Sequence, residues 1–261
     1  MKNIKASILI INYNNKKYLS QCLNSIINQS FGNQIEIIFH DDNSTDNSLK
    51  EIKKFKNIKI IKNKLRTSYG SYNQIKAVKR ALAVSSGNII FLLDSDDFFS
   101  KNKIKKILNY FNKNKDIDLI FDLPALKIGN KLKKNIFKKK NFQRHWNYIH
   151  PQSCISLRRK LLKQIISKVD FKKFPDIWLD FRISIYAKYI LKKFYIFNEY
   201  LTIYRITNNS ASSAFKKFSK NWWTRRSQAH AYVKYFFKKN KIKYKENIDY
   251  VLTTIINKIL K

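Results

Sequence analysis

Apolar residues follow two different patterns along the first half of the chain. Short unbroken apolar runs alternate with segments in which apolar residues recur every three or four positions, as on one face of a helix. The unbroken runs are typical of strands buried on both faces of a parallel sheet. Such runs, interrupted by Glu36 in the second and by Lys59 in the third, predict strands at residues 7–11, 35–39, 58–61 and 89–93, with helices at 18–29 and 70–85 and a third that ends near residue 55. This order predicts a parallel, doubly wound α/β sheet with right-handed crossovers.

The pattern becomes less regular after residue 97. We predict helices at 101–112, at 158–168 and from about 180 to 191, and strands at 118–121, 194–197 and 201–205. The lysine-rich stretch 127–141 is weakly patterned and is expected to be a loop or a hairpin. From Phe215 onward, aromatic residues alternate with many lysines and arginines, which predicts a basic, aromatic helical tail. This tail could bind a membrane surface or pack on the rest of the protein.

Carboxylates gather where the fourth predicted strand ends, at Asp94, Asp96 and Asp97. Three carboxylates at one strand terminus repel each other, and a divalent cation with oxygen ligands is the usual means of keeping them charged together. The carboxyl ends of the strands are also where ligands bind in open α/β sheets. The simpler interpretation is that Asp94 or Ser95 caps the helix that follows and that the other acids are solvated. For a cluster of three acids, we favour the metal site.

The balance of 54 Lys and Arg against 17 Asp and Glu gives a formal net charge of +37. Such an excess favours polyanionic partners, namely nucleic acid, anionic lipid or phosphorylated substrates. Lys, Asn and Ile are frequent throughout the chain, so part of the charge reflects a general bias in composition. Because acids are scarce, the few aspartate clusters are the more informative.

Cysteine spacing and the length of the apolar runs indicate the cellular compartment in which the protein is expected. Cys22 and Cys154 form no C-x-x-C motif, which argues against disulfides and zinc ribbons and favours a reducing environment. The apolar run 6–11 is too short for a signal peptide, and no run approaches the length of a membrane span. We therefore expect a cytoplasmic protein, which can also lie peripherally on the inner face of the cytoplasmic membrane.

Glycine is rare, with four residues in the whole chain, and neither G-x-G-x-x-G nor G-x-x-x-x-G-K-[ST] occurs. These absences exclude a dinucleotide fingerprint and a Walker A loop at the level of motifs. A strand that ends in Asp can mimic a Walker B motif, but the partner loop is missing. A bound phosphate must therefore be held by a metal ion and basic side chains rather than by a glycine-rich loop.

Three stretches of the chain carry motifs at the ends of predicted strands: residues 7–14 lead to a Tyr-Asn, residues 38–46 contain D-D-x-S-x-D, and residues 93–97 contain D-x-D. These stretches resemble the opening strand, the D-D-x-S-x-D loop and the D-x-D metal motif of the inverting family 2 glycosyltransferases of GT-A fold. Each motif follows its expected strand, so the three together are far more specific than any one alone. The resemblance implies one GT-A domain with a nucleotide-sugar-binding half at 1–123 and an acceptor-binding half at 124–214, followed by the helical tail at 215–261.

The resemblance also implies roles for residues on the donor side. Tyr13 offers a ring face to the base, Asp42 marks the nucleoside site, and Arg66 can neutralise a phosphate. Asp94 and Asp96 stand where the D-x-D motif engages the ribose and a metal ion, Mg²⁺ or Mn²⁺, which bridges the diphosphate. Asp97 is a further metal ligand or a hydrogen-bond partner of one. The alternatives are a tyrosine at the edge of the core for Tyr13 and a solvated side chain for Arg66.

An inverting transfer needs a base opposite the leaving group, outside the nucleotide half. Asp180 follows Pro-Asp-Ile-Trp-Leu, where the family usually carries a Glu-Asp or a lone Asp base, so the resemblance implies that Asp180 is the base. Here Leu179 replaces the Glu of that pair. Asp180 is also suited to be the N-cap of the helix that it precedes. Asp176 is the second candidate.

The function predicted from the sequence is inverting, metal-assisted transfer of a hexose. The donor is a nucleotide-diphosphate sugar, with a UDP-sugar expected. The acceptor is a hydroxyl group of a glycan or lipid-linked molecule in cell-surface polysaccharide or lipopolysaccharide synthesis. The tail is expected to bind an anionic membrane surface. Which sugar, base, acceptor and linkage are involved stays open.

Two other classes of protein compete with this prediction. A basic nucleic-acid-binding protein without catalysis would carry its basic residues on one face, but it would not account for acids at three strand ends. A phosphatase or phosphomutase would carry its D-x-D motif on the first strand, whereas here the motif follows the fourth. We therefore expect no nucleic acid among the partners.

Overall fold

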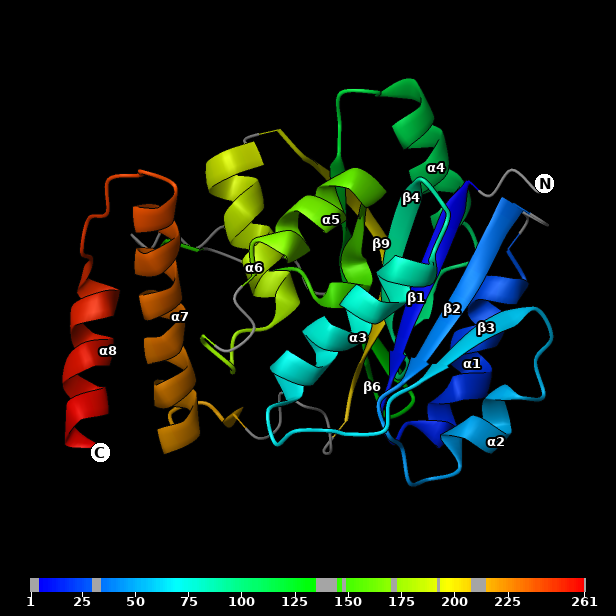
Figure 1. The fold of residues 1–261 in the computed structure, drawn as a ribbon, viewed down its shortest axis with the longest axis horizontal. Helices are drawn as coiled ribbons and strands as arrows, with labels where there is room; N and C mark the ends of the chain where they lie inside the picture. The colour runs from blue at the N-terminus through cyan, green and yellow to red at the C-terminus, as the bar shows by residue number, and fades with distance from the viewer. Residues whose placement is uncertain are drawn as a thin grey trace.

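The computed structural model describes residues 5–29, 34–134, 145–146, 149–169, 173–191, 193–207 and 215–260. Its strands form one mixed sheet in the order β3-β2-β1-β4-β8-β6-β9-β5, with β7 paired to β6, and helices cover both faces (Figure 1). The strands are β1 (Ala6–Asn12), β2 (Ile35–Asp41), β3 (Ile58–Lys62), β4 (Ile89–Asp94), β5 (Phe98–Phe99), β6 (Leu119–Ile128), β7 (Lys131–Lys134), β8 (Ile155–Arg158) and β9 (Tyr195–Ile206). The α-helices are α1 (Lys16–Ile27), α2 (Ser48–Ile52), α3 (Gly70–Val84), α4 (Lys103–Lys113), α5 (Arg159–Ser167), α6 (Leu179–Tyr186), α7 (Lys220–Lys239) and α8 (Ile248–Ile259).

The first half of the sheet is parallel, and its central strands β1 and β4 are buried on both faces. Strands β3, β2, β1 and β4 are hydrogen-bonded neighbours that all run in the same direction. Along β1, Leu9 and Ile11 join the apolar core that contains residues of α3, α5 and α6, whereas Ile8 and Ile10 join the core beneath α1 and α4. This alternation confirms the predicted doubly wound α/β arrangement.

The second half of the sheet differs from the predicted strands. Strand β8 was not predicted, yet it pairs antiparallel with both β4 and β6 and so joins the two halves of the chain. The two strands predicted at 194–197 and 201–205 are in fact the single strand β9. Its register against β6 shifts beside Asp122 and Leu123, where a β-bulge accommodates Asn198 and Glu199.

Strand β6 is longer than the four residues predicted for it. It continues through Pro124 to Ile128. The residues before Pro124 pair with β8 and those after it pair with β7, so the missing N–H of Pro124 interrupts neither set of inter-strand hydrogen bonds. The β6–β7 pair makes the described part of the stretch 127–141 a hairpin, and residues 135–141 lie outside the described residues. The boundary proposed after residue 123 falls inside β6, and therefore both halves share one sheet.

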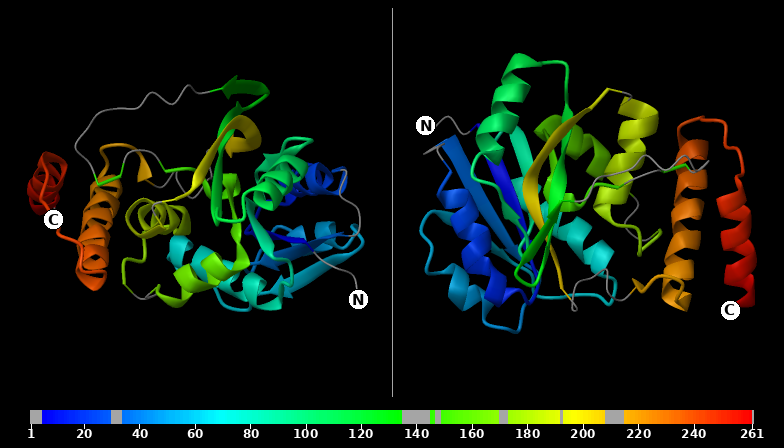
Figure 2. Two further views of the ribbon diagram at one scale, coloured as in Figure 1. Left: turned by 90° about the horizontal axis from the view of Figure 1, so that it is seen from above. Right: turned by 180° about the vertical axis from the view of Figure 1, so that it is seen from behind.

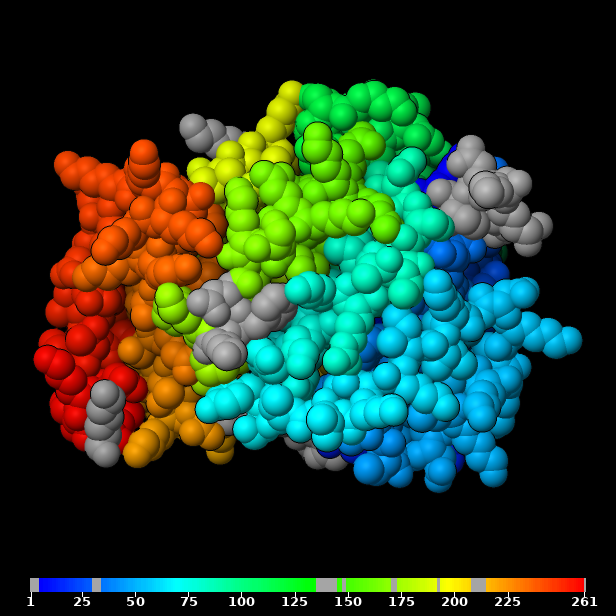
Figure 3. Space-filling view, in the orientation of Figure 1, coloured from blue at the N-terminus to red at the C-terminus, as the bar shows by residue number. Residues whose placement is uncertain are grey.

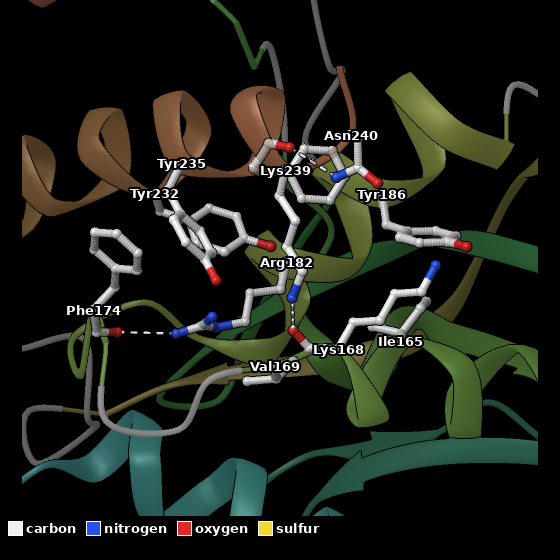
Figure 4. A pocket seen from close by; sticks show the side chains of 11 residues that line it. Ile165, Lys168, Val169, Phe174, Arg182, Tyr186, Tyr232, Tyr235, Lys239 and Asn240 are labelled. Carbon is white, nitrogen blue, oxygen red and sulfur yellow. Dashed lines mark hydrogen bonds between the residues drawn. The ribbon is translucent and has the colours of Figure 1, made fainter. Parts of the chain in front are cut away.

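Helices α7 and α8 lie side by side at the end of the molecule farthest from β2 and β3 (Figures 1 and 2). Tyr232, Val233 and Phe236 of α7 are buried in the same core as α6, so Phe236 packs on the domain, as the second interpretation of the tail expected. Figure 4 shows, at close range, a neighbouring pocket lined by residues of α6 and α7. Arg182 of α6 lies below Tyr232 and donates to the carbonyl of Phe174 at 3.0 Å, in a cavity of about 210 Å³.

The outer helix, α8, is packed much less closely than α7. Thr253 is its one buried residue, and a stripe of five apolar side chains at helical spacing is exposed: Ile248, Val251, Leu252, Ile255 and Ile259. Figure 3 shows α7 and α8 forming one end of the molecular surface. Within the described ranges, no helix is both long enough and apolar enough to span a bilayer.

Candidate active site

A cavity of about 520 Å³ lies at the carboxyl ends of β1, β2 and β4 and is closed on the other side by α6 and α7. Six of the seven predicted site residues line it, namely Tyr13, Asp42, Arg66, Asp94, Asp96 and Asp180. Asp97 is the seventh and lies beneath the wall rather than on it. The fold thus brings into one cavity side chains that are up to 167 positions apart in the sequence, since the set runs from residue 13 to residue 180.

One end of the cavity is built from the loops after β1 and β2. The backbone N–H of Asp42 donates to the carbonyl of Asn12 at 2.8 Å, which carries the pairing of β1 and β2 one residue further. The Asp42 carboxylate accepts from Asn63 at 2.7 Å and forms an ion pair with Arg66. The Arg66 guanidinium also stacks on the Tyr13 ring, 3.4 Å from its centroid.

These contacts answer two alternatives left by the sequence. Tyr13 is 41% exposed and lines the cavity, so it is not a tyrosine of the core edge. Arg66 is held between a carboxylate and a ring, so it is not a solvated side chain. Burial raises the pKa of Asp42, while hydrogen bonds from Asn63 and Arg66 oppose that shift.

Asp94 closes strand β4 and is held in place by polar neighbours. Its N–H donates to Ser153 Oγ at 3.0 Å, and its Oδ1 accepts from Gln152 at 2.7 Å and from Gln74 at 3.3 Å. Burial, followed by the negative charges of Asp96 and Asp180, raises the pKa of Asp94 to about 8. A cation placed among these carboxylates would favour their charged forms.

Asp97 is positioned differently from the other two acids of the motif. Its side chain is buried, its Oδ2 accepts from Ser153 Oγ at 2.6 Å, and its Oδ1 accepts from the N–H of Arg205 at 2.8 Å. This arrangement favours the second of its two predicted roles, a hydrogen-bond partner behind the site. Helix α4 has Asn102 at its N-cap, and so neither Asp94 nor Ser95 caps it.

A buried ion pair supports this loop from below. Lys103 and Asp122 are fully buried, and Lys103 Nζ lies 2.7 Å from the Asp122 carboxylate. Lys103 Nζ also donates to the carbonyl of Ser153 and to Thr202 Oγ1, each at 2.6 Å. Because Ser153 in turn contacts Asp94 and Asp97, the ion pair fixes the loop that carries the carboxylates.

Asp180 enters the cavity from the first turn of α6. The N-cap of this helix is Trp178, so the interpretation of Asp180 as the N-cap is wrong. Its Oδ1 accepts from the N–H of Phe181 at 2.6 Å. Burial raises the pKa of Asp180 to about 6, while the positive charge of Arg225 opposes that shift. The second candidate, Asp176, is absent from the cavity wall and accepts from Gln228 at 2.7 Å.

The carboxylates suit a cation that takes only part of its ligands from protein. Within the described ranges, no group of three or more His, Cys, Asp and Glu side chains could hold a metal ion unaided. Mg²⁺ commonly binds one or two carboxylates and completes its shell with water and substrate phosphates. No other described residue donates to the Asp96 side chain, and both amide donors to Asp94 use the same oxygen. One oxygen of Asp94 and the carboxylate of Asp96 therefore fit such an ion.

Several residues of the wall were not predicted from the sequence. They are Asn15, Gln74, Gln152, Trp178, Tyr204 and Arg225. In the sequence, Trp178 stands out only as a neighbour of Asp180, and Arg225 is one of many basic residues of the tail. No pattern local to the sequence marks them, because their role depends on α3, β9 and α7 converging on one cavity.

The chain matches the family model described as glycosyl transferase family 2 over residues 7–166, and it belongs to that family. Among the classes considered from the sequence, this match selects the glycosyltransferase. A glycosyltransferase of Methanocaldococcus jannaschii is 31% identical over 216 residues, which cover 77% of this chain and 71% of that protein. TarS of Staphylococcus aureus, a poly(ribitol-phosphate) beta-N-acetylglucosaminyltransferase, is 28% identical over 137 residues, 52% of this chain and 23% of TarS.

Solved structures agree with the predicted fold. Residues 1–349 of TarS in complex with UDP-GlcNAc match with a TM-score of 0.64 at 18% identity, over 87% of this chain and 66% of that one. The mannosyltransferase PcManGT from Pyrobaculum calidifontis, solved with GDP-Man and Mn²⁺, matches with a TM-score of 0.62 at 13% identity, over 98% and 69%. The predicted GT-A fold is thereby confirmed.

Proposed function

We propose that the protein transfers a sugar from a nucleotide-diphosphate sugar to a hydroxyl group of a glycan or lipid-linked acceptor, with inversion at the anomeric carbon. The observation that carries the proposal is the single cavity lined by both the predicted donor residues and the predicted base. The nucleotide sugars bound to TarS and PcManGT support a donor of this class, and a UDP-sugar is the first candidate. The product would be a cell-surface polysaccharide or lipopolysaccharide.

The donor would lie along the half of the chain that spans residues 1–123. Tyr13 and Asp42 would hold the nucleoside, because they offer a ring face and a hydrogen-bond acceptor, and Arg66, which contacts both, would neutralise a phosphate. Asp94 and Asp96 would hold Mg²⁺ or Mn²⁺. When bound, such an ion supplies positive charge that offsets the charge growing on the departing diphosphate.

Asp180 would act as the base on the acceptor side, in residues 124–214. It lines the same cavity as Asp94 and Asp96, and its charge contributes to the raised pKa of Asp94. A carboxylate with a pKa of about 6 is mostly charged at neutral pH, yet it is basic enough to take a proton from an attacking hydroxyl group. Its place in the first turn of α6 fixes the backbone that carries it.

The tail, residues 215–261, would hold the protein at an anionic membrane surface. The apolar stripe of α8 is exposed, and the adjoining loop carries Lys241, Lys243 and Lys245. An amphipathic helix with lysines beside its apolar face suits the boundary between lipid headgroups and acyl chains. Such an anchor would bring the active site close to a lipid-linked acceptor.

A screen of nucleotide sugars by thermal shift, with and without Mn²⁺, tests the proposal. One family of donors should raise the melting temperature in a manner that depends on Mn²⁺, since Asp94 and Asp96 would hold an ion whose charge would offset that of the diphosphate. Failure of every nucleotide sugar to stabilise the protein in the presence of Mn²⁺ would contradict a nucleotide-sugar donor.

A further inference from the structure

A second cavity, of about 310 Å³, adjoins the first beneath the amino-terminal part of α7. The two cavities share the wall residues Ile149, Trp178, Phe181 and Arg225. The remaining wall is strongly aromatic, with Trp146, Phe215 and Trp222. Flat aromatic rings around a partly open groove suit the apolar C–H faces of a sugar or polyol. We call this second cavity the aromatic groove.

Arg225 stands where the aromatic groove meets the donor cavity. Its guanidinium lies 4.7 Å from the centroid of the Phe215 ring and 5.8 Å from that of Trp178. None of the described residues accepts a hydrogen bond from it or forms an ion pair with it, and Asp180 and Asp176 act on it only through longer-range electrostatics. Burial lowers the pKa of Arg225. The neighbouring Arg226 differs, because it forms an ion pair with Asp249 of α8.

A partly buried guanidinium without an acceptor is costly unless a ligand supplies one. Its planar array of N–H donors matches the oxygens of a phosphate group. The donor diphosphate already has candidate partners in Arg66 and in the metal site at Asp94 and Asp96. Arg225 instead lies beside the candidate base Asp180, at the entrance to the aromatic groove. An anion bound there would be next to the hydroxyl group that Asp180 deprotonates.

We propose that Arg225 binds a phosphate group of the acceptor, and that the aromatic groove holds the sugar or polyol to which this phosphate is attached. This inference rests on the proposed function, since it assigns the acceptor class of the same site. The acceptor is then a sugar or polyol phosphate rather than a neutral glycan. Arg225 determines specificity, while Asp180 remains the base.

Tryptophan fluorescence gives a direct readout, because three of the four tryptophans of the chain line the aromatic groove. The probes are glucose 6-phosphate, glucose and inorganic phosphate. Glucose 6-phosphate should change the emission of the wild-type protein in a saturable manner and bind more tightly than glucose or phosphate alone. Arg225→Gln should lose at least about tenfold in affinity for glucose 6-phosphate, since it removes a charge-assisted pair of hydrogen bonds. Lys238→Gln, which removes one exposed charge from the same helix, should bind like the wild type.

Three results would overturn the inference. The first is that glucose 6-phosphate gives no saturable response with the wild type, and the second is that the wild type and Arg225→Gln bind it equally well. The third is that Arg225→Gln loses affinity for UDP but not for glucose 6-phosphate. Arg225→Lys is a control for misfolding of the Gln variant. It keeps the positive charge but lacks the planar guanidinium, so it should bind glucose 6-phosphate with intermediate affinity. Asp42→Ala separates the two proposals: it should lose UDP binding and keep the response to glucose 6-phosphate. A wild type that binds no nucleotide sugar but shows the Arg225-dependent response would refute the donor proposal alone.

Discussion

The guanidinium of Arg66 lies 3.4 Å from the centroid of the Tyr13 ring while it forms an ion pair with the Asp42 carboxylate. One arginine thus links the loop after β1 to the loop after β2. A base that stacks on Tyr13 must use the opposite ring face or displace this guanidinium. We therefore expect nucleoside binding to depend on Arg66 through its contacts with Tyr13 and Asp42 as well as through its charge.

Replacing Arg66 with Ala should weaken donor binding by roughly tenfold to a hundredfold, because it removes a charge-assisted contact and leaves Asp42 without its cation. Calorimetric titration with UDP and Mn²⁺ measures the effect. Lys64→Ala is the matched control, since it removes one exposed positive charge from the same loop. Equal losses in the two variants would mean that Arg66 acts only through general electrostatic attraction.

Asp96→Asn should abolish Mn²⁺-dependent binding of the nucleotide and leave the fold intact. The Asp96 side chain lines the cavity and receives no hydrogen bond from another described residue, so its loss should not disturb the packing. Circular dichroism checks the fold, and the UDP titration is run with and without Mn²⁺. Asp116→Asn, at an exposed surface pair with Lys193, serves as the control. Near-wild-type transfer by the Asp96 variant would show that the metal site lies elsewhere.

Asp180→Asn should lower turnover by roughly 10²–10⁴-fold and leave the affinity for the donor almost unchanged, because a base contacts only the acceptor. The pKa of about 6 sets the pH dependence. A base works in its charged form, so the wild-type rate should fall as the pH drops below about 6. The residual rate of the variant should not show this decrease. Asp42→Ala should behave in the opposite way and weaken donor binding first. If Asp180→Asn loses donor affinity as strongly as rate, Asp180 belongs to the donor site, and Asp176 becomes the base to test.

Lys103→Met should destabilise the protein by about 3–5 kcal/mol, since it leaves the buried Asp122 carboxylate without its partner. Urea unfolding measures the change in the free energy of unfolding. The double variant Lys103→Met/Asp122→Leu removes both charges and should recover much of the loss. Lys193→Met breaks an exposed ion pair with Asp116 and should cost far less, because solvent screens an exposed pair. Similar losses for the two lysines would contradict the role given to the buried pair.

Replacing Leu252 and Ile255 with Glu should reduce binding to anionic vesicles, because both residues lie in the exposed apolar stripe of α8. Flotation with vesicles that contain or lack phosphatidylserine measures binding, and raised salt should weaken it, since each nearby Lys contributes about 1 kcal/mol. Asn257→Glu is the control, because it adds one negative charge to α8 outside the apolar stripe. The membrane proposal fails if the wild type floats equally well with neutral vesicles, or with neither kind.

Local patterns predicted the parallel half of the fold and six of the residues that line the cavity. The strands that end at Asn12, Asp41 and Asp94 are largely apolar, and the aspartates at the ends of the last two stand out because the chain is so basic. The same patterns failed for β8 and β9, because pairing across the sheet decided those strands more than the local sequence did. The contacts of Gln152 and Arg225 could not be predicted from the local sequence either, since they depend on segments that meet only in the folded chain.

The buried cluster around Lys103 has a further consequence for how such a chain can diversify. Lys103 and Asp97 belong to the amino-terminal half, whereas their partners Ser153, Thr202 and Arg205 belong to the carboxyl-terminal half. A fragment that stops after residue 123 would expose this lysine and aspartate without those partners, so it should not be a self-sufficient nucleotide-binding module. Recombination between relatives could exchange the loops that line the cavity, but it would have to inherit β8, β9 and the D-x-D loop together.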